Sequence, residues 1–416
     1  MRHSARSRKA GITYAIALCI GVSLCDVALD AAPKLPAPVP TPVDLYSIRA
    51  PFKDSEIVAT ASPSFGGAIY SLTWNGMEFL SSADFGSELQ SSVYLNGFGE
   101  KCNPIEVGSY HDSIPSSVTS MRVDHNGKVL STSSLMRYAY QTRRDCGNDP
   151  VHFRKVVTLG YAGIPNVIEH DVVYSLPKDY NHDLSKWPAY NHATFMALSA
   201  NLPLANFPKQ YYYDPRTKIL SSIPDTQRNA GRNVPPIIAT QDGQHALGVY
   251  SRGTPAIQKT NLIYTQWRSV EGDIEAVEPL NEWICRYNHH EPISAGDYRF
   301  KCYSVIGTLQ DVQEGIDRLY ALTAAPDVSF TSPQHGAYVS GIVTLTAKAG
   351  DEANIIAVIF KDGDQVIGAE VRSPPYTVFW NTSDVPDGSH RLYAIARNPG
   401  LKSTSTSVDV TVANRR

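Results

Sequence analysis

Charged residues are scarce in this chain, and the scarcity argues against two kinds of partner. Of its 416 residues 19% are charged, and 37 Lys and Arg stand against 40 Asp and Glu, for a formal net charge of -3. Such a balance provides no positive field that would attract nucleic acid or an anionic membrane surface. We therefore expect neither as a partner of the mature protein.

Common catalytic fingerprints are missing as well. The sequence contains no Gly-x-x-x-x-Gly-Lys-Ser/Thr loop, no Gly-x-Gly-x-x-Gly turn and no Gly-x-Ser-x-Gly elbow. These patterns cradle phosphates, bind dinucleotides and expose a nucleophilic serine. Nucleotide, redox and serine-hydrolase functions thus have no support, and we expect no cofactor.

Cysteine is rare, with six copies, and two of these lie in an N-terminal segment that we expect to be removed. An even number of remaining cysteines in an exported chain indicates disulfide bonds. Short spacing favours Cys102 with Cys146 and Cys285 with Cys302, the second pair joining neighbouring strands, although three connectivities are open. A zinc site is the rival interpretation, but no Cys-x-x-Cys or paired-histidine spacing accompanies these cysteines, so we expect no metal.

The apolar run Gly11–Cys25 is too short to span a membrane. It holds about 15 residues, against the roughly 20 that a spanning helix needs. Basic residues precede the run and small alanines follow it, which is the arrangement of a cleavable export signal. These residues are Arg2, Arg6, Arg8 and Lys9, then Ala28, Ala31 and Ala32. We predict a signal over residues 1–32 and a periplasmic or secreted protein; an uncleaved anchor and a lipoprotein modified at Cys25 are weaker alternatives.

Turn residues and tyrosine are abundant, with 28 Gly, 28 Pro and 23 Tyr. Glycine and proline form turns, whereas tyrosine favours strands and can stack on flat ligands such as sugars. Five prolines fall within Pro33–Pro42, and we predict an extended spacer over residues 33–47. The remainder is predicted to be globular and all-β, with two domains.

One helical pattern, Asp311–Ala325, marks the predicted end of the first domain. Val312, Ile316 and Leu319 recur within it at helical spacing. Before it, over residues 48–325, short apolar runs alternate with turns, as in a large antiparallel β-domain. These runs are 68–72, 129–140, 152–159, 167–174, 246–250 and 298–307.

Seven strand-like runs follow Pro326 at the spacing of a small β-sandwich. They are 328–332, 341–349, 355–361, 365–371, 376–381, 390–397 and 403–412. The phrases Ser-Pro-Gln-His-Gly-Ala-Tyr, Pro-Tyr-Thr-Val-Phe-Trp-Asn-Thr and Pro-Asp-Gly-Ser-His-Arg-Leu-Tyr make residues 326–416 similar to a bacterial Ig-like domain. The segment has no cysteine, so Trp380 and its apolar neighbours must hold the two sheets together.

The run Asn191–Leu198 reads Asn-His-Ala-Thr-Phe-Met-Ala-Leu and places a histidine in an apolar strand. It resembles the Asn-His-x-x-Phe-x-Leu signature of aldose 1-epimerases (galactose mutarotases). A glycine-rich opening at 66–72, an Asn-Gly turn in 75–80 and a late Gly-Asp-Tyr strand at 296–298 follow the order found in that family. The resemblance implies a mutarotase-like supersandwich over residues 48–325, with a carbohydrate as the ligand.

The resemblance also implies an acid and a base. Epimerases protonate the ring oxygen of a sugar with a histidine and deprotonate its anomeric hydroxyl with a carboxylate. His192 would be the acid and Glu278, in a Val-Glu-Pro segment, the base, with Glu282 as the rival carboxylate. The residues alone leave open a core role for His192 and a solvated acidic loop around Glu278.

Aromatic and polar residues in the same domain are candidates to contact a sugar. The substrate-binding candidates are Trp187, Tyr190, Asn191, Glu100, Asn103, Glu106, Trp267 and Trp283. Because tyrosine and tryptophan also fill β-sandwich interiors, we expect only two or three aromatics to be exposed. The segment 97–106 lacks the arginine and second histidine of family epimerases, which argues against mutarotation of free sugars.

Three functions remain. The first is a secreted carbohydrate-active enzyme that acts on a glycan or oligosaccharide through a His/Glu pair, as an epimerase, hydrolase or lyase. The second is a noncatalytic glycan-binding or cell-surface module, and the third is a structural envelope protein. An enzyme needs His192 and a carboxylate converging on one site, whereas a binder needs only exposed aromatics.

Overall fold

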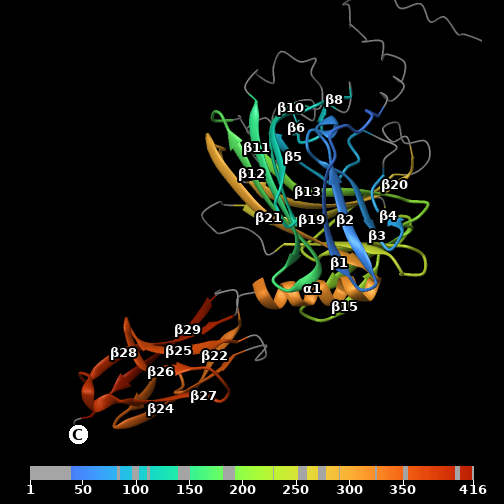
Figure 1. Ribbon diagram of the computed structural model, residues 1–416. Coiled ribbons are helices and arrows are strands. Elements are labelled where there is room, and N and C mark those ends of the chain that lie inside the picture. The colour runs from blue at the N-terminus through green and yellow to red at the C-terminus, as the bar shows by residue number, and fades with distance from the viewer. Residues whose placement is uncertain are drawn as a thin grey trace, which may run out of the picture. The chain divides into compact units, whose positions relative to one another are not determined.

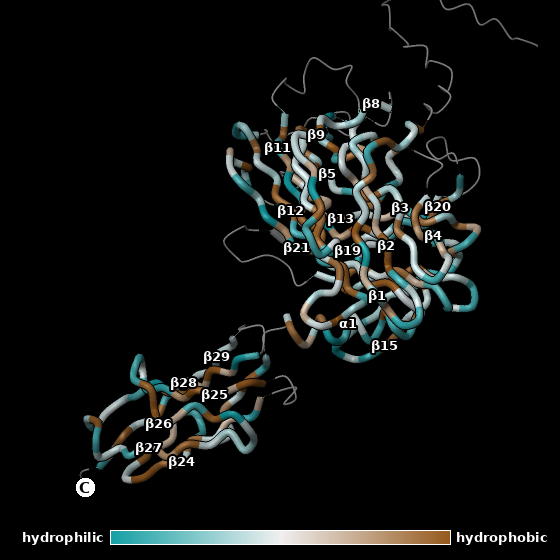
Figure 2. The backbone as a smooth tube through the Cα atoms, viewed as in Figure 1, coloured by the Kyte–Doolittle hydropathy of each residue, from teal (hydrophilic) through white to brown (hydrophobic). Residues whose placement is uncertain are grey.

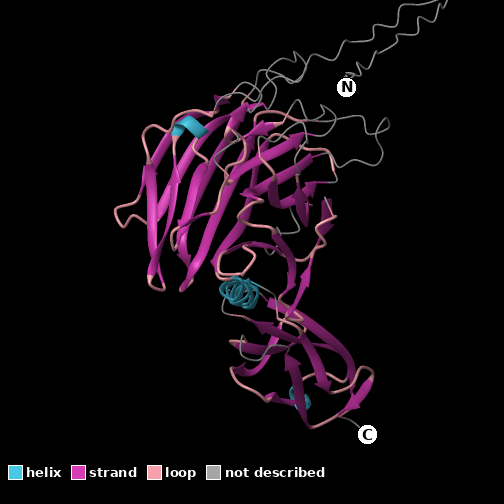
Figure 3. Ribbon diagram, turned by 90° about the vertical axis from the view of Figure 1, so that its right-hand side faces the viewer, coloured by secondary structure: helices cyan, strands magenta, loops and turns pink. Residues whose placement is uncertain are grey.

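The computed structural model (Figure 1) describes residues 39–81, 85–95, 103–109, 113–138, 150–180, 193–227, 229–251, 260–269, 278–289, 291–323, 326–349, 355–398 and 403–414. The predicted signal lies outside these residues, as do residues 33–38 of the predicted spacer; the end of that spacer overlaps the first strand, Tyr46–Phe52. Strands dominate the described part of the chain, and α1 is its one α-helix (Figure 3). The all-β fold class is therefore confirmed. None of the helices in these ranges is long and apolar enough to cross a membrane.

The large domain, which precedes residue 326, begins with a small antiparallel sheet in which consecutive strands are neighbours. Its strands are β1 (Tyr46–Phe52), β2 (Ser55–Ala61), β3 (Ile69–Trp74) and β4 (Met77–Glu78). The 3-10 turn η1 (Pro63–Phe65) connects β2 to β3. Asn75 and Gly76 join β3 to β4 with φ angles of 49° and 75°, as a two-residue hairpin requires.

A 15-stranded antiparallel sheet forms most of the large domain. We describe it as two half-sheets. The first half-sheet runs in the order β15 (Ile219–Ser222), β14 (Lys209–Asp214), β17 (Pro236–Ala239), β18 (Ala246–Tyr250), β21 (Gly296–Gly307), β12 (Ile164–Leu176), β11 (Val151–Tyr161) and β10 (Val129–Tyr138), with β9 (Ser117–Val123) also paired to β10. The second half-sheet continues with β6 (Pro104–Ile105), β5 (Gln90–Leu95), β13 (Ala193–Pro203), β20 (Leu280–His289), β19 (Thr260–Arg268) and β16 (Asn229–Arg232). A separate two-stranded pair consists of β7 (Gly108–Ser109) and β8 (Ile114–Pro115).

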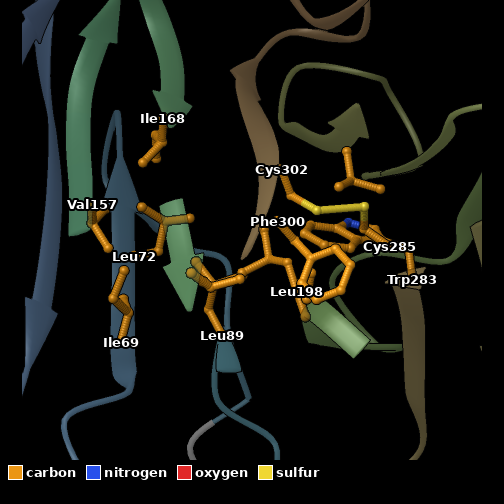
Figure 4. Close-up of a cluster of buried hydrophobic side chains, with 14 of the residues drawn as sticks. Ile69, Leu72, Leu89, Val157, Ile168, Leu198, Trp283, Cys285, Phe300 and Cys302 are labelled. Atoms are coloured by element: carbon orange, nitrogen blue, oxygen red, sulfur yellow. A yellow bond between two sulfur atoms is a disulfide. The ribbon is translucent and has the colours of Figure 1, made fainter. Parts of the chain in front are cut away.

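The main hydrophobic core lies between the small sheet and the two half-sheets. Figure 4 shows Ile69 and Leu72 of the small sheet near Val157 and Ile168 of the first half-sheet, all of them fully buried or nearly so. Leu198 of the second half-sheet belongs to the same cluster. Apolar residues alternate with polar ones along the strands (Figure 2), which is the pattern expected of a sheet with one face in a core.

A disulfide between Cys285 and Cys302 crosses this core (Figure 4). The predicted pairing is confirmed, but its predicted setting was wrong. Cys285 lies on β20 in the second half-sheet and Cys302 on β21 in the first, so the two strands are consecutive in the chain without being neighbours in a sheet. Both sulfurs point into the interior because both cysteines are fully buried. The bond therefore joins opposite half-sheets. Cys102 and Cys146 lie outside the described residues.

Helix α1 (Leu309–Thr323) covers the other face of the first half-sheet. It begins two residues before the predicted helix because Thr308 caps it: Asp311 Oδ2 accepts hydrogen bonds from the Thr308 amide and hydroxyl, and Thr308 Oγ1 accepts one from the Asp311 amide. Val312, Ile316 and Leu319 are buried against this half-sheet, as their spacing predicted.

The C-terminal domain is a sandwich of two sheets. One sheet has the order β22 (Val328–Ser332), β24 (Ile342–Ala349) and β27 (Tyr376–Asn381), and the other β23 (Ala337–Val339), β29 (Ser403–Val412), β28 (Gly388–Arg397), β25 (Ala357–Asp362) and β26 (Gln365–Val371). A 3-10 turn, η7 (Thr382–Asp384), follows β27. All seven predicted strands are present; β23 was missed because three residues are too few to show alternation. Trp380 is buried in the core between the sheets, as expected.

Candidate functional site

The candidate site lies on the outer face of the second half-sheet, which is the side that points away from the disulfide. On β20, Trp283, Cys285 and Tyr287 are fully buried in the core. Successive side chains of a strand point to opposite faces. Glu282 and Arg286 therefore belong to the outer face, and both are half-buried there.

Glu282 sits between two polar or aromatic side chains of neighbouring strands. In the strand register it lies opposite Asn201 of β13 on one side and Trp267 of β19 on the other. Directly opposed residues point to the same face with their Cβ atoms about 5 Å apart. Trp267 is half-buried, and Asn201 is 8% exposed. The structure thus brings together two predicted site residues, Glu282 and Trp267.

The carboxyl group of Glu282 has no hydrogen bond or ion pair among the residues that the structure describes. Burial against the sheet raises its pKa to about 8. A carboxyl group with that pKa keeps its proton near neutral pH, because loss of water disfavours the charged form. Glu282 therefore presents a protonated carboxyl group on this face at neutral pH.

Glu278 lies just before β20 and close to the end of β13. Its Oε1 accepts a hydrogen bond from the Ser81 hydroxyl. The Ser81 amide in turn donates to the backbone oxygen of Asn201 at 2.9 Å, which places Ser81 beside the strand position opposite Glu282. Glu278 is half-buried.

Arg286 is the residue of this face that our sequence reasoning missed. It lies opposite Met196 of β13 and Ile263 of β19. Its Nε is buried and has no hydrogen-bond partner within the described ranges. Burial lowers the pKa of the guanidinium, and the nearby Tyr94 acts in the opposite direction. The alternation along β20 could have predicted its position, because once Cys285 is assigned to the core, Glu282 and Arg286 must face outward.

The predicted site residues Glu106 and Trp283 lie elsewhere. Glu106 is fully buried in the interior, where Lys155 Nζ donates to both of its carboxylate oxygens at 2.9 and 3.2 Å. Burial raises the pKa of Glu106, and Lys155 opposes the increase. Trp283 is fully buried in the core. Neither side chain reaches the outer face.

Asn103 lies just before β6 and is 4% exposed, and its Oδ1 has no hydrogen-bond partner among the residues that the structure describes. The remaining predicted site residues, His192, Asn191, Tyr190, Trp187 and Glu100, lie outside the described residues. Strand β13 begins at Ala193, the residue directly after His192. Within the described ranges, no group of His, Cys, Asp and Glu side chains is arranged to hold a metal ion.

Comparison with known proteins identifies one part of the chain. Residues 326–394 match the family described as bacterial Ig domain, in agreement with the eight-stranded sandwich found there. This confirms the resemblance seen in the sequence of the segment. No curated protein matches the chain.

Similarities to solved structures are remote. A mutant of heparan sulfate lyase HepC from Pedobacter heparinus is 9% identical over 77% of this chain and 42% of that chain, with a TM-score of 0.34. A polysaccharide lyase is 10% identical over 88% of this chain and 47% of its own, with a TM-score of 0.32. The fibronectin(III)-like modules of Clostridium thermocellum CbhA are 21% identical over 21% of this chain and 94% of theirs, with a TM-score of 0.19. The chain spans less than half the length of either lyase, and function must be argued from the site.

Proposed function

We propose that this protein is carbohydrate-active and that the outer face of the second half-sheet binds a glycan or oligosaccharide. One observation carries the proposal: Glu282, a carboxyl group whose burial raises its pKa to about 8, lies between Trp267 and Asn201. An indole supplies a flat apolar surface for a sugar ring, and an amide can bind its hydroxyls. A protonated carboxyl group can donate to a glycosidic or ring oxygen.

In this proposal Glu282 is the general acid, and a second group receives a proton. The mutarotase-like resemblance supplies two candidates, Glu278 and His192. Glu278 precedes the same strand as Glu282, and His192 precedes β13, which pairs with β20 along its whole length. Epimerisation, hydrolysis and elimination all use such a pair of groups, so the face suits any of the three reactions.

The cellular location follows from independent features. A buried disulfide is typical of proteins that fold outside the reducing cytosol. The C-terminal domain belongs to a bacterial Ig family. We place the protein in the periplasm or outside a bacterial cell, where polysaccharides are accessible.

The test is a glycan panel combined with two variants. We would measure binding, released reducing ends, unsaturated uronic products and anomer exchange. Glu282→Gln should lower kcat by roughly 10²- to 10⁴-fold with little change in binding, because only the proton is lost. Trp267→Ala should weaken binding by roughly 3- to 10-fold through loss of stacking.

Two matched controls make the result specific. Glu314→Gln removes an exposed carboxylate on α1, and Tyr338→Ala removes an aromatic side chain that is 80% exposed on β23. Neither should alter binding or turnover. Binding that depends on Trp267 without any turnover would show a noncatalytic glycan-binding module. Binding that depends on Tyr338 instead of Trp267 would refute the proposed face.

A further inference from the structure

We propose that Arg286 makes this face selective for acidic sugars, by pairing with the carboxylate of a uronic acid residue. The inference rests on the proposed glycan site and names its substrate class. It begins from a guanidinium group that has no counter-ion among the described residues.

The guanidinium of Arg286 makes no hydrogen bond or ion pair within the described part of the chain, and its Nε is buried. Arg268 on the adjacent strand β19 differs from Arg286 because its guanidinium is paired. Arg268 lies on the opposite face of β19 with its own side chain buried; it donates to Asn281 Oδ1 at 2.9 Å and pairs with the exposed carboxylate of Asp225 at 3.0 Å. A buried charge without a partner is costly, and a structural arginine is normally paired as Arg268 is.

Arg286 pairs with no acidic side chain among the described residues, and Tyr94 is a polar group that acts on its guanidinium. Its cross-strand neighbours are Met196 and Ile263, and the next outward residue of its own strand towards Glu282 is Ile284. Glu282 is four residues away along β20, on the order of 13 Å, which is too far for an ion pair. It is also protonated near neutral pH.

An external carboxylate would satisfy the guanidinium. Arginine presents a planar fork of N–H donors that matches the two oxygens of a carboxylate. Because the spacing between Glu282 and Arg286 exceeds one sugar ring, the two side chains would contact different residues of the same chain. The ligand is thus a uronate-containing oligosaccharide or polymer at least two residues long.

The experiment compares polymers that differ only in charge. Polygalacturonate, alginate and hyaluronan are each titrated beside their carboxyl-reduced, neutral forms, with dextran sulfate as a sulfated arm. We expect at least one polyuronate to bind the wild-type protein about tenfold or more tightly than its reduced form, since hydrogen bonds to charged groups contribute about 1.5–3 kcal/mol. Arg286→Gln should reduce that ratio to near one without weakening binding of the neutral polymer.

Two further variants sharpen the result. Arg286→Lys keeps the charge but loses the fork, and it should retain part of the preference. Arg154→Gln removes an exposed arginine of β11, with a side chain 61% exposed, and should change nothing. An unaltered ratio in Arg286→Gln would overturn the proposal, as would equal binding of every polyuronate and its reduced form. Tight binding confined to dextran sulfate would exclude a carboxylate as the ligand group.

These outcomes separate the two proposals. If Trp267→Ala weakens binding of a neutral glycan and no polyuronate is preferred, the glycan site is correct and the acidic-sugar assignment is wrong. If Trp267→Ala alters no binding at all, the site itself is wrong.

Discussion

The carboxyl groups of Glu106 and Glu282 are buried in different surroundings, one with a charged partner and one without a described partner. Glu106 has Lys155 as a direct partner, and the pair is enclosed in the core. His170 lies in the same interior, where it bonds Ser304 at 2.9 Å, and burial followed by the charge of Lys155 lowers its pKa well below the usual value. Glu282 is half-buried and has no such partner in the part of the chain that the structure describes. A paired interior charge serves the fold, whereas a lone protonated carboxyl group on an outer face is available for a ligand.

The raised pKa of Glu282 predicts a pH-dependent stability. The folded state keeps the proton up to about pH 8, whereas the unfolded chain releases it near 4.5. Between these values the folded state binds the extra proton, so stability falls as the pH rises from about 4.5 to about 8. Glu282→Gln removes this decline. Its Tm should match the wild type near pH 5 and exceed it near pH 9, by about 2–4 °C for each kcal/mol relieved.

Differential scanning calorimetry at the two pH values checks this prediction, with Glu314→Gln as the control whose Tm follows the wild type at both. Any turnover that uses Glu282 as the acid should fall above about pH 8, where its protonated form is lost. A Tm difference that is the same at pH 5 and pH 9 would show that Glu282 is already ionised.

The second half-sheet is the element that creates the site, and the disulfide fixes which of its faces is inward. Cys285 anchors β20 to β21 across the core, so the alternate side chains of β20 are directed outward. Strand β20 lies between β13 and β19, which contribute Asn201 and Trp267 from segments about 80 and 15 residues away in the chain. The site is therefore assembled by strand pairing.

Removing the disulfide should weaken this domain without abolishing its fold. Cys285→Ala with Cys302→Ala opens a loop with a sequence separation of 17, and loops of about this length are stabilised by about 3 kcal/mol on closure. We expect the double variant to unfold at a lower temperature than the wild type under oxidising conditions. Reductant should lower the Tm of the wild type toward that of the variant.

The response of the double variant to reductant is informative in itself. A further loss of stability would indicate the predicted second disulfide between Cys102 and Cys146, which alkylation under nonreducing conditions would confirm. If the double variant and the wild type unfold at the same temperature, the Cys285–Cys302 bond does not stabilise the fold.

At the scale of the whole molecule, the two described domains have separate hydrophobic cores. The core of the large domain and that of the Ig-like sandwich share no residue. Each core is large enough to support a fold of its own. The proposed site draws on the large domain alone.

Residues 326–416 should therefore fold as an independent unit, and a chain ending at Ala325 should retain the binding and turnover of the full protein. Circular dichroism and cooperative thermal unfolding of both fragments provide the measurement. An unfolded C-terminal fragment, or a large domain that binds no glycan while the full chain does, would contradict the separation.

The sequence by itself determined the local structure of this protein, because strand alternation, turns and caps depend on neighbouring residues. Trp380 in the core of the Ig-like sandwich, the Asn75-Gly76 hairpin and α1 could all be predicted in this way. The pairing of Cys285 with Cys302 could also be predicted, since these two cysteines are close in the chain.

Only the tertiary structure decided which polar residues form a site. The sequence shows Glu106, Glu278 and Glu282 as equivalent carboxylates, and Trp267 and Trp283 as equivalent indoles. Their environments differ because burial and pairing depend on strands that are distant in the chain: Lys155 pairs with Glu106, whereas Glu282 and Arg286 have no ion-pair partner among the described residues. A pKa and an unpaired charge are properties of the surrounding fold, and no local pattern encodes them.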